Sequence, residues 1–181
     1  MTLHVQTGRK NEILRRISKP VEKITKDLKH FALDLIDTMN AENGVGLAAP
    51  QAGRNIRMVV CKFNPGSTNE LTMIMLNPEI IEAADDSESG EEGCLSLPDE
   101  WGMVDRSTRV LVRFQTLKGA TQTLEFFDFN ARIIQHEIDH LDGVLFVDRA
   151  TEMKTEKKEK SQPKKSEDHC GCGDDHEHPA L

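Results

Sequence analysis

Residues 135–140 of this chain read QHEIDH, and this short segment constrains the fold more than any other. Its two histidines are four residues apart, so a helix places both imidazoles on one face. His136 and His140 can then bind the same metal ion, and Glu137 can accept a proton from water. A hydrolytic centre of this kind also needs a third protein ligand and an open position for water. The fold must therefore bring a third donor to this helix.

The known zinc-protease patterns do not supply that third ligand. One pattern has a histidine six residues after the second histidine of the motif, where this chain has Phe146. Another uses a downstream glutamate, but Glu152, Glu156 and Glu159 lie in a lysine-rich stretch that cannot hold a ligand in place. Cys94 is the better candidate, because it lies among small residues in a turn-like segment. A thiolate with two imidazoles leaves one position open; the alternative is a small cysteine buried in the core.

The composition fits one folded domain with a polar extension. The chain has 181 residues, of which 37% are hydrophobic and 30% are charged, and its net charge is -8. This acidic balance argues against a nucleic-acid binder. No apolar run approaches the length of a membrane span, and residues 1–10 lack the apolar core of a signal peptide. We therefore expect a cytoplasmic protein without a membrane or DNA partner.

The hydrophobic pattern predicts an α+β fold. Apolar residues at three- and four-residue spacing predict an amphipathic helix from about Thr25 to Met39, and residues 130–141 form a second helix that contains the histidine motif. Strands are predicted at residues 57–63, 71–76, 103–104, 109–116 and 120–127. Residues 82–92 are acidic and polar, which predicts a surface loop. We expect antiparallel β-sheets packed around a central metal-ligand helix, with the amphipathic helix N-terminal to them.

The composition changes abruptly after Arg149. Residues 151–165 are almost entirely Lys, Glu, Ser, Thr and Gln, and residues 168–178 are Cys, His, Gly and acidic residues. Neither stretch can bury a core, so we expect a catalytic domain over residues 1–150 and a polar, disordered tail over residues 151–181. The Cys/His-rich end of the tail is either a tract that buffers or delivers metal or an incidental acidic extension.

Three motifs, in this order, resemble those of the peptide deformylase family. Residues 44–51 read GVGLAAPQ and match the family pattern Gly-x-Gly-x-Ala-Ala-x-Gln. Residues 92–96 read EGCLS and match the second motif, and residues 135–140 match the third. The resemblance covers about residues 10–150. It implies metal-dependent hydrolysis of the formamide at the N-terminus of newly made proteins, with release of formate.

The resemblance also implies roles for the residues at the matching positions. The metal ligands would be Cys94, His136 and His140. Glu137 would accept the proton of water and deliver it to the departing nitrogen. The Gln51 side-chain amide and the Leu95 backbone N–H would stabilise the oxyanion. Because a thiolate suits soft or borderline ions, we expect one divalent metal ion, iron(II) first, with zinc, nickel and cobalt as alternatives.

The expected substrate is a nascent formyl-methionyl polypeptide in an extended conformation. Val45 and Gly46 on one side and Gly93 on the other resemble the family's backbone-pairing positions, at which the peptide adds as a strand. The methionine side chain needs an apolar pocket. The candidates for its wall are Val45 and Ile133, which lies three residues before His136. Plain core packing is the alternative for both residues.

Three further expectations concern residues outside this set. Asp139 is expected to anchor the helix by pairing with Arg106 or Arg132. Trp101, the only tryptophan, either lines the rim of the cleft or caps the core. The lysines of residues 153–160 either contact ribosomal RNA or belong to a solvated extension. The competing functions are an endopeptidase, disfavoured by the missing third histidine, and a metal-storage protein that uses the tail.

Overall fold

The computed structural model describes residues 1–155 of the 181-residue chain. The Cys/His-rich tract and most of the lysine-rich stretch lie outside these residues, so the expectations for them have no structural counterpart. In chain order, the elements are α1 (Lys26–Ala41), β1 (Gly46–Ala48), η1 (Ala49–Ala52), β2 (Met58–Phe63), β3 (Leu71–Ala83), β4 (Ser87–Cys94), β5 (Leu97–Ser107), β6 (Arg109–Gln115), β7 (Thr121–Phe127), α2 (Asp128–Leu141), η2 (Phe146–Asp148) and β8 (Glu152–Thr155).

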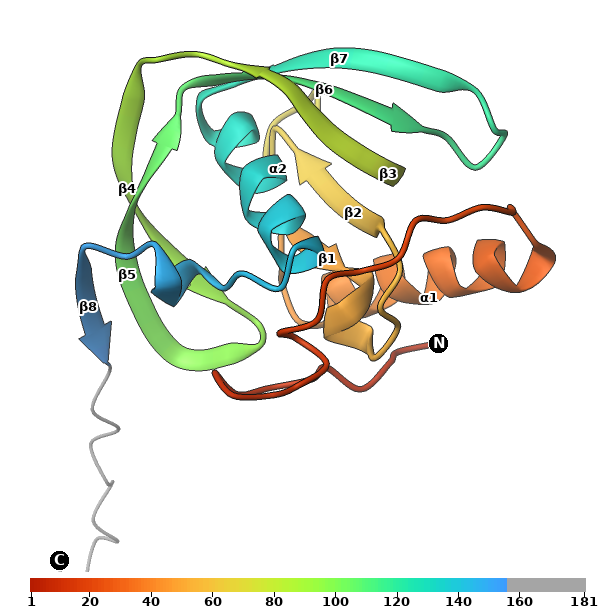
Figure 1. Cartoon of the computed structure of the whole chain (residues 1–181), viewed down its shortest axis with the longest axis horizontal. Coiled ribbons are helices and arrows are strands. Elements are labelled where there is room, and N and C mark those ends of the chain that lie inside the picture. Colours follow the sequence, from red (N-terminus) through yellow and green to blue (C-terminus); the bar gives the residue numbers. More distant parts are fainter. Residues whose placement is uncertain (156–181) are drawn as a thin grey trace, which may run out of the picture.

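Two antiparallel sheets and helix α2 form the body of the fold (Figure 1). One sheet has five strands in the order β1-β2-β3-β6-β7, and the other has three in the order β4-β5-β8. All neighbouring strands within them are antiparallel. Helix α2 runs between the three-stranded sheet and strands β1 and β2, and it contacts strands of both sheets. The predicted mixture of helix and antiparallel sheet is confirmed.

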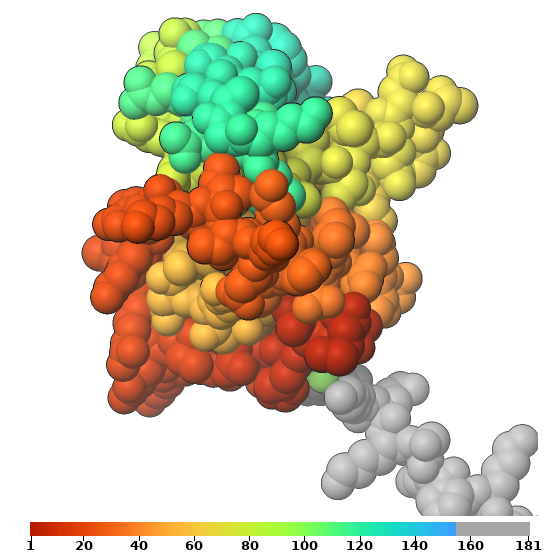
Figure 2. Space-filling view, turned by 90° about the vertical axis from the view of Figure 1, so that its right-hand side faces the viewer, coloured from red at the N-terminus to blue at the C-terminus, as the bar shows by residue number. Residues whose placement is uncertain are grey.

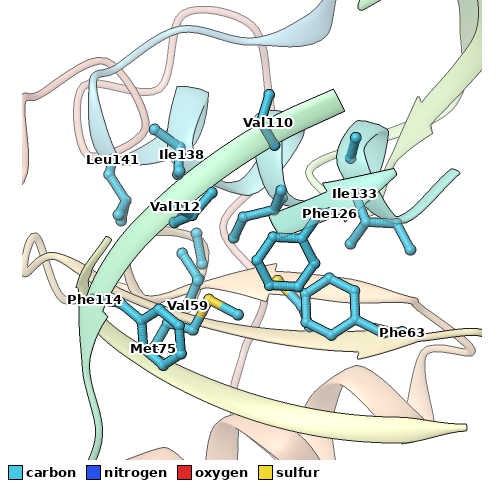
Figure 3. Close-up of a cluster of buried hydrophobic side chains, with 14 residues drawn as sticks. Val59, Phe63, Met75, Val110, Val112, Phe114, Phe126, Ile133, Ile138 and Leu141 are labelled. Atoms are coloured by element: carbon cyan, nitrogen blue, oxygen red, sulfur yellow. The ribbon is translucent and has the colours of Figure 1, made fainter. Parts of the chain in front are cut away.

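One face of α2 packs into the main hydrophobic core against the five-stranded sheet (Figure 3). Ile134, Ile138 and Leu141 lie on this face and are buried. Each fully buried side chain of this size stabilises the fold by about 2 kcal/mol. His136 and His140 lie roughly 200° from Ile134 and Ile138 around the helix axis, since each residue advances the helix by about 100°. Core packing on one side therefore turns the two histidines away from the five-stranded sheet.

Helix α1 begins where the sequence predicts. Thr25 Oγ1 accepts a hydrogen bond from the Leu28 backbone N–H at 3.1 Å, a cap that contributes about 1 kcal/mol. Leu35 of α1 packs with Leu47 of β1, whereas the next residue, Ala48, belongs to the α2 core. This alternation places β1 between the two helices. Figure 2 shows the N-terminal residues and α1 (red to orange) covering the surface below the β6–β7 hairpin (teal).

Two regions differ from the sequence prediction. Residues 82–92, predicted as a loop, contain the end of β3 and most of β4. Half of the eight β4 residues are exposed and most of the eight are polar, so its sequence carries no apolar alternation, and backbone pairing with β5 makes it a strand. The described structure also continues past residue 150, because Glu152–Thr155 forms β8 and pairs with β5. Within residues 1–155, neither helix is long and apolar enough to cross a membrane.

Candidate metal centre

Cys94 and the two motif histidines lie together where the three-stranded sheet meets α2. Cys94 is the last residue of β4, and its donor atom and those of His136 and His140 all lie within 4.8 Å of one another. Cys94 Sγ is 3.2 Å from His140 Nε2. Burial lowers the pKa of His140 well below its usual value, and the neighbouring His136 acts in the same direction. A neutral imidazole is the form that binds a metal, so His140 is in the form that a divalent ion requires.

Two buried polar atoms at this cluster have no hydrogen-bond partner among residues 1–155. They are Glu137 Oε2 and His140 Nδ1. Burial raises the pKa of Glu137 to about 7, although the nearby His136 acts to lower it. Buried polar atoms are nearly always paired, so an unpaired carboxylate oxygen beside three metal-type donors indicates a site for an ion and its water. The residues present therefore fit a bound metal.

Glu92 orients His136. Its Oε2 lies 2.9 Å from His136 Nδ1, which leaves the opposite nitrogen of the ring for a metal. Arg106 and Arg132 also donate to this buried carboxylate. Burial acts to raise the pKa of Glu92, but hydrogen bonds with His136 and Arg106 outweigh it and lower the pKa overall. Glu92 therefore stays ionised. Sequence reasoning missed this role, although Glu92 begins the second motif.

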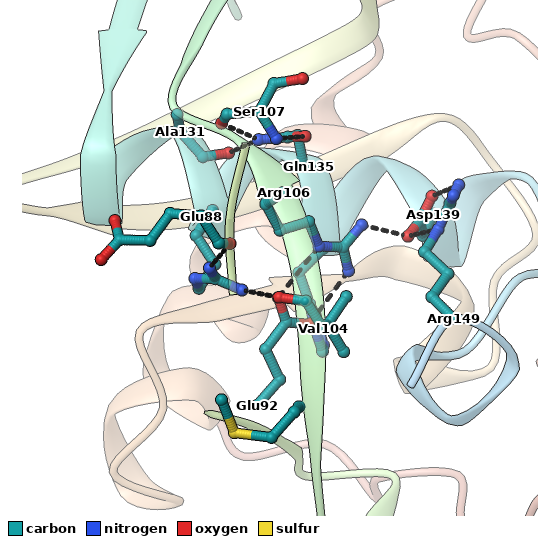
Figure 4. Close-up of polar contacts among 12 residues, drawn as sticks. Glu88, Glu92, Val104, Arg106, Ser107, Ala131, Gln135, Asp139 and Arg149 are labelled. Carbon is teal, nitrogen blue, oxygen red and sulfur yellow. Dashed lines mark hydrogen bonds and ion pairs between the residues drawn. The ribbon is translucent and has the colours of Figure 1, made fainter. Parts of the chain in front are cut away.

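Asp139 ties α2 to the three-stranded sheet (Figure 4). Arg106 Nη1 donates to Asp139 Oδ2 at 2.6 Å, and Arg149 donates to both oxygens of the same carboxylate at 2.7 Å. The predicted pairing of Asp139 with Arg106 is confirmed. Arg132, the other predicted partner, instead donates to Glu92 at 2.9 Å. Arg106 thus joins two buried carboxylates, one on β4 and one on α2.

The Gln51 amide faces the cluster with its nitrogen. Gln51 Nε2 lies 3.4 Å from Cys94 Sγ and 3.1 Å from Ser96 Oγ, while Oε1 accepts from the Ala48 backbone N–H at 2.8 Å. The Ala48 donor can pair only with the amide oxygen, so this contact sets the orientation of the amide. Leu95 follows Cys94 directly, which puts its backbone N–H next to that residue. A side-chain donor and a backbone N–H therefore adjoin Cys94.

A pocket of about 460 Å³ opens beside the cluster, lined by residues of β1, β4, β5 and α2. The substrate-binding residues predicted from the sequence all line it: Val45, Gly46, Gly93 and Ile133. Ile133 also belongs to the main core, so it lines the pocket and packs in the core at the same time. Trp101 lines the pocket with its side chain 42% exposed, which places it at the rim and not over the core.

Residues 46 and 146 lie next to the cluster and limit which side chains the site can hold. A Cβ at residue 46 would lie 2.2 Å from Glu137 Oε1, so only glycine lets the β1 backbone come this close to the carboxylate. Phe146, at the position of the absent third histidine, is buried and stacks beside His136 with 6.3 Å between ring centroids. Residue 146 therefore packs against His136 and offers no donor of its own.

A cysteine sulfur, two imidazoles and a buried carboxylate with one unpaired oxygen at a single pocket are the groups of a mononuclear metal-dependent hydrolase. The family model for polypeptide deformylase matches residues 5–156. The peptide deformylase of Desulforudis audaxviator is 44% identical over 139 residues, which are 77% of this chain and 88% of that protein. The chain belongs to the polypeptide deformylase family.

Solved structures agree with this assignment. Two crystal structures of class I type b peptide deformylase from Acinetobacter baumannii match with TM-scores of 0.78 and 0.76 at 41% and 39% identity. Each match covers 82% of this chain, and 99% and 98% of those chains. The family removes the N-formyl group from nascent polypeptides by hydrolysis and uses a divalent metal, so the predicted family, activity and enzyme class are confirmed.

Proposed function

We propose that this protein deformylates nascent polypeptides at a centre whose metal ligands are Cys94, His136 and His140. Helix α2 then serves as the central metal-ligand helix, and residues 1–150 together with β8 form the catalytic domain. The observation that carries the proposal is the convergence of these three donors with the unpaired Glu137 carboxylate at one pocket.

Residues at the centre can take up the proton of the attacking water and stabilise the negative charge that develops on the formyl oxygen. A divalent ion held by the three donors supplies Lewis acidity, which lowers the pKa of water and polarises the formyl oxygen. Glu137 accepts the proton of the attacking water and delivers it to the departing nitrogen, because an amine leaves poorly without a proton. Gln51 Nε2 and the Leu95 N–H donate to the formyl oxygen as negative charge develops on it.

The substrate enters as an extended strand between two sheet edges. Strands β1 and β4 are edge strands of different sheets in the described chain, and residues of both line the pocket. The Val45 carbonyl already accepts from the Lys62 N–H at 2.8 Å, so we assign the pairing to the remaining backbone groups of Val45 and Gly46 on one side and to Gly93 on the other. Backbone pairing of this kind accepts a peptide of any sequence. Ile133 and Val45 supply the apolar wall for methionine. One A. baumannii crystal structure has Met-Ala-Ser bound, a peptide of the expected product type.

The test of this function is formate release from formyl-Met-Ala-Ser by the metal-loaded full chain. We expect formate and free Met-Ala-Ser in equal amounts, and no internal cleavage of an unformylated peptide of mixed sequence. Internal cleavage without formate would identify an endopeptidase. Several tightly held ions per chain without hydrolysis would identify a metal-storage protein.

We propose iron(II) as the resident metal. One thiolate and two imidazoles favour soft or borderline ions, and zinc, nickel and cobalt share that preference. We expect elemental analysis after anaerobic purification to find about one iron per chain, falling after exposure to air because a thiolate-bound iron centre is open to oxidation. Zinc or nickel in place of iron in the anaerobic protein would contradict this assignment.

We infer the location of the protein from its activity, and a further partner from its sequence. The protein acts in the cytoplasm, where nascent chains are made. The sequence beyond β8 is polar, and the lysines of residues 153–160 are the segment that we assign to ribosome contact on the basis of their charge. Most of that segment lies beyond residue 155, so the assignment is independent of the fold described above.

A further inference from the structure

We propose that Trp101 is a specificity residue of this deformylase. Its indole ring forms a platform for an aromatic or other large apolar side chain in one of the first two substrate residues after methionine. The proposal rests on the function proposed above. It adds a side-chain preference to a binding mode that otherwise pairs only backbone groups.

The indole ring reaches across the strand next to its own. Gly93 of β4 and Trp101 of β5 are directly opposite each other in the antiparallel ladder. A Cβ at residue 93 would lie 2.6 Å from Trp101 Cζ3, 2.7 Å from Cε3 and 3.0 Å from Cη2. The outer edge of the ring therefore occupies the space that a side chain at residue 93 would fill. Glycine at this position lets the ring extend over β4.

Beyond β4 lies the expected path of the substrate. Strand β4 is an edge strand of its sheet within residues 1–155, and Gly93 is one of the proposed pairing positions. Residues in register across a sheet share a face, and adjacent strands are about 4.8 Å apart. A peptide residue paired with Gly93 would therefore present its side chain, or that of its neighbour two residues on, beside the ring.

The exposure and surroundings of the ring favour an apolar partner. The Trp101 side chain is 42% exposed and lines the same pocket as His136 and Glu137. Lys154, opposite Trp101 on β8, directs its ammonium to Glu91 at 2.8 Å, so these two charges near the ring already satisfy each other. An aromatic side chain laid on the indole removes apolar surface of both groups from water.

The selectivity is tested with three substrates and the metal-loaded full chain. We expect kcat/KM for formyl-Met-Phe-Ser or formyl-Met-Ser-Phe to exceed that for formyl-Met-Ser-Ser by about fivefold, which is ~1 kcal/mol. In Trp101→Ala this ratio should fall to about one, whereas Trp101→Phe should keep part of it. The control is Leu33→Ala, another exposed apolar residue, on α1, which should keep the full ratio.

Tryptophan fluorescence can measure peptide binding to the unmodified protein. The chain has one tryptophan and no tyrosine, so its emission comes from Trp101. Titration with the product Met-Phe-Ser or Met-Ser-Phe should shift this emission more strongly than titration with Met-Ser-Ser. An absent phenylalanine preference, a ratio that survives in Trp101→Ala, or a preference for lysine or arginine instead would overturn the proposal. If formyl-Met-Ser-Ser releases no formate, the deformylase function fails, and the emission still tests the platform.

Discussion

Replacement of Glu137 by glutamine is expected to lower formate release by roughly 10²–10⁴-fold while the protein keeps its metal. Glutamine has nearly the same shape as glutamate but cannot accept the proton of water. Glu137 is 4% exposed, and its Oε2 has no partner among residues 1–155, so no other described group takes over its proton. It is not one of the three clustered donors, and metal content should therefore stay near that of the unmodified protein.

The control for Glu137→Gln is another carboxyl-to-amide change, at a residue outside the pocket. Asp142 follows the last residue of α2 and pairs with Arg57 at 2.6 Å, outside the pocket lining. Asp142→Asn should keep formate release within about twofold, as surface substitutions usually change little. Metal content and formate release are measured on the same preparations. Turnover that survives in Glu137→Gln would show that another group moves the proton, and loss of metal would show that Glu137 is a ligand.

The sequence predicted those parts of the centre that depend on local geometry. His136 and His140 needed only the helix repeat, and Thr25 needed only the rule for helix caps. Cys94 could be proposed because its motif stands apart from the helix in sequence, but only the fold shows the end of β4 beside α2. Local periodicity therefore located the helix and its two histidines, whereas pairing between distant segments completed the cluster of donors.

The remaining features depend on tertiary contacts that leave no periodic pattern. Strand β4 consists mostly of polar residues, so its sequence predicts a loop, and only its ladder with β5 makes it a strand. Glu92 begins the second motif but ends an acidic stretch that predicts an exposed loop, yet it is buried against two arginines and His136. The position of Trp101 opposite Gly93 follows only from the register of β4 and β5. Cross-strand register is the information that sequence reasoning lacked.

The second large effect is expected for Arg106→Met. Arg106 is 5% exposed and joins Glu92 and Asp139, through bonds of 2.9 Å and 2.6 Å. Removing it leaves two buried carboxylates with fewer partners, although Arg132 still holds Glu92 and Arg149 still holds Asp139. Breaking a buried pair in this way costs about 3 kcal/mol. For a chain of this size that lowers Tm by about 10 °C.

Arg109→Met is the matched control, because Arg109 also pairs with two carboxylates, those of Glu82 and Glu125, but at the surface. Exposed pairs contribute at most about 1 kcal/mol, so its Tm should fall by a few degrees at most. Thermal unfolding is measured with chelator, because bound metal would add its own stabilisation to every melt.

The metal affinity of the two variants is measured separately. It should fall about tenfold in Arg106→Met alone, since Glu92 orients His136 and Arg106 holds Glu92. Equal melts for the two variants would show that the buried arginine contributes no more than a surface one. An unchanged metal affinity would show that Glu92 holds His136 without it.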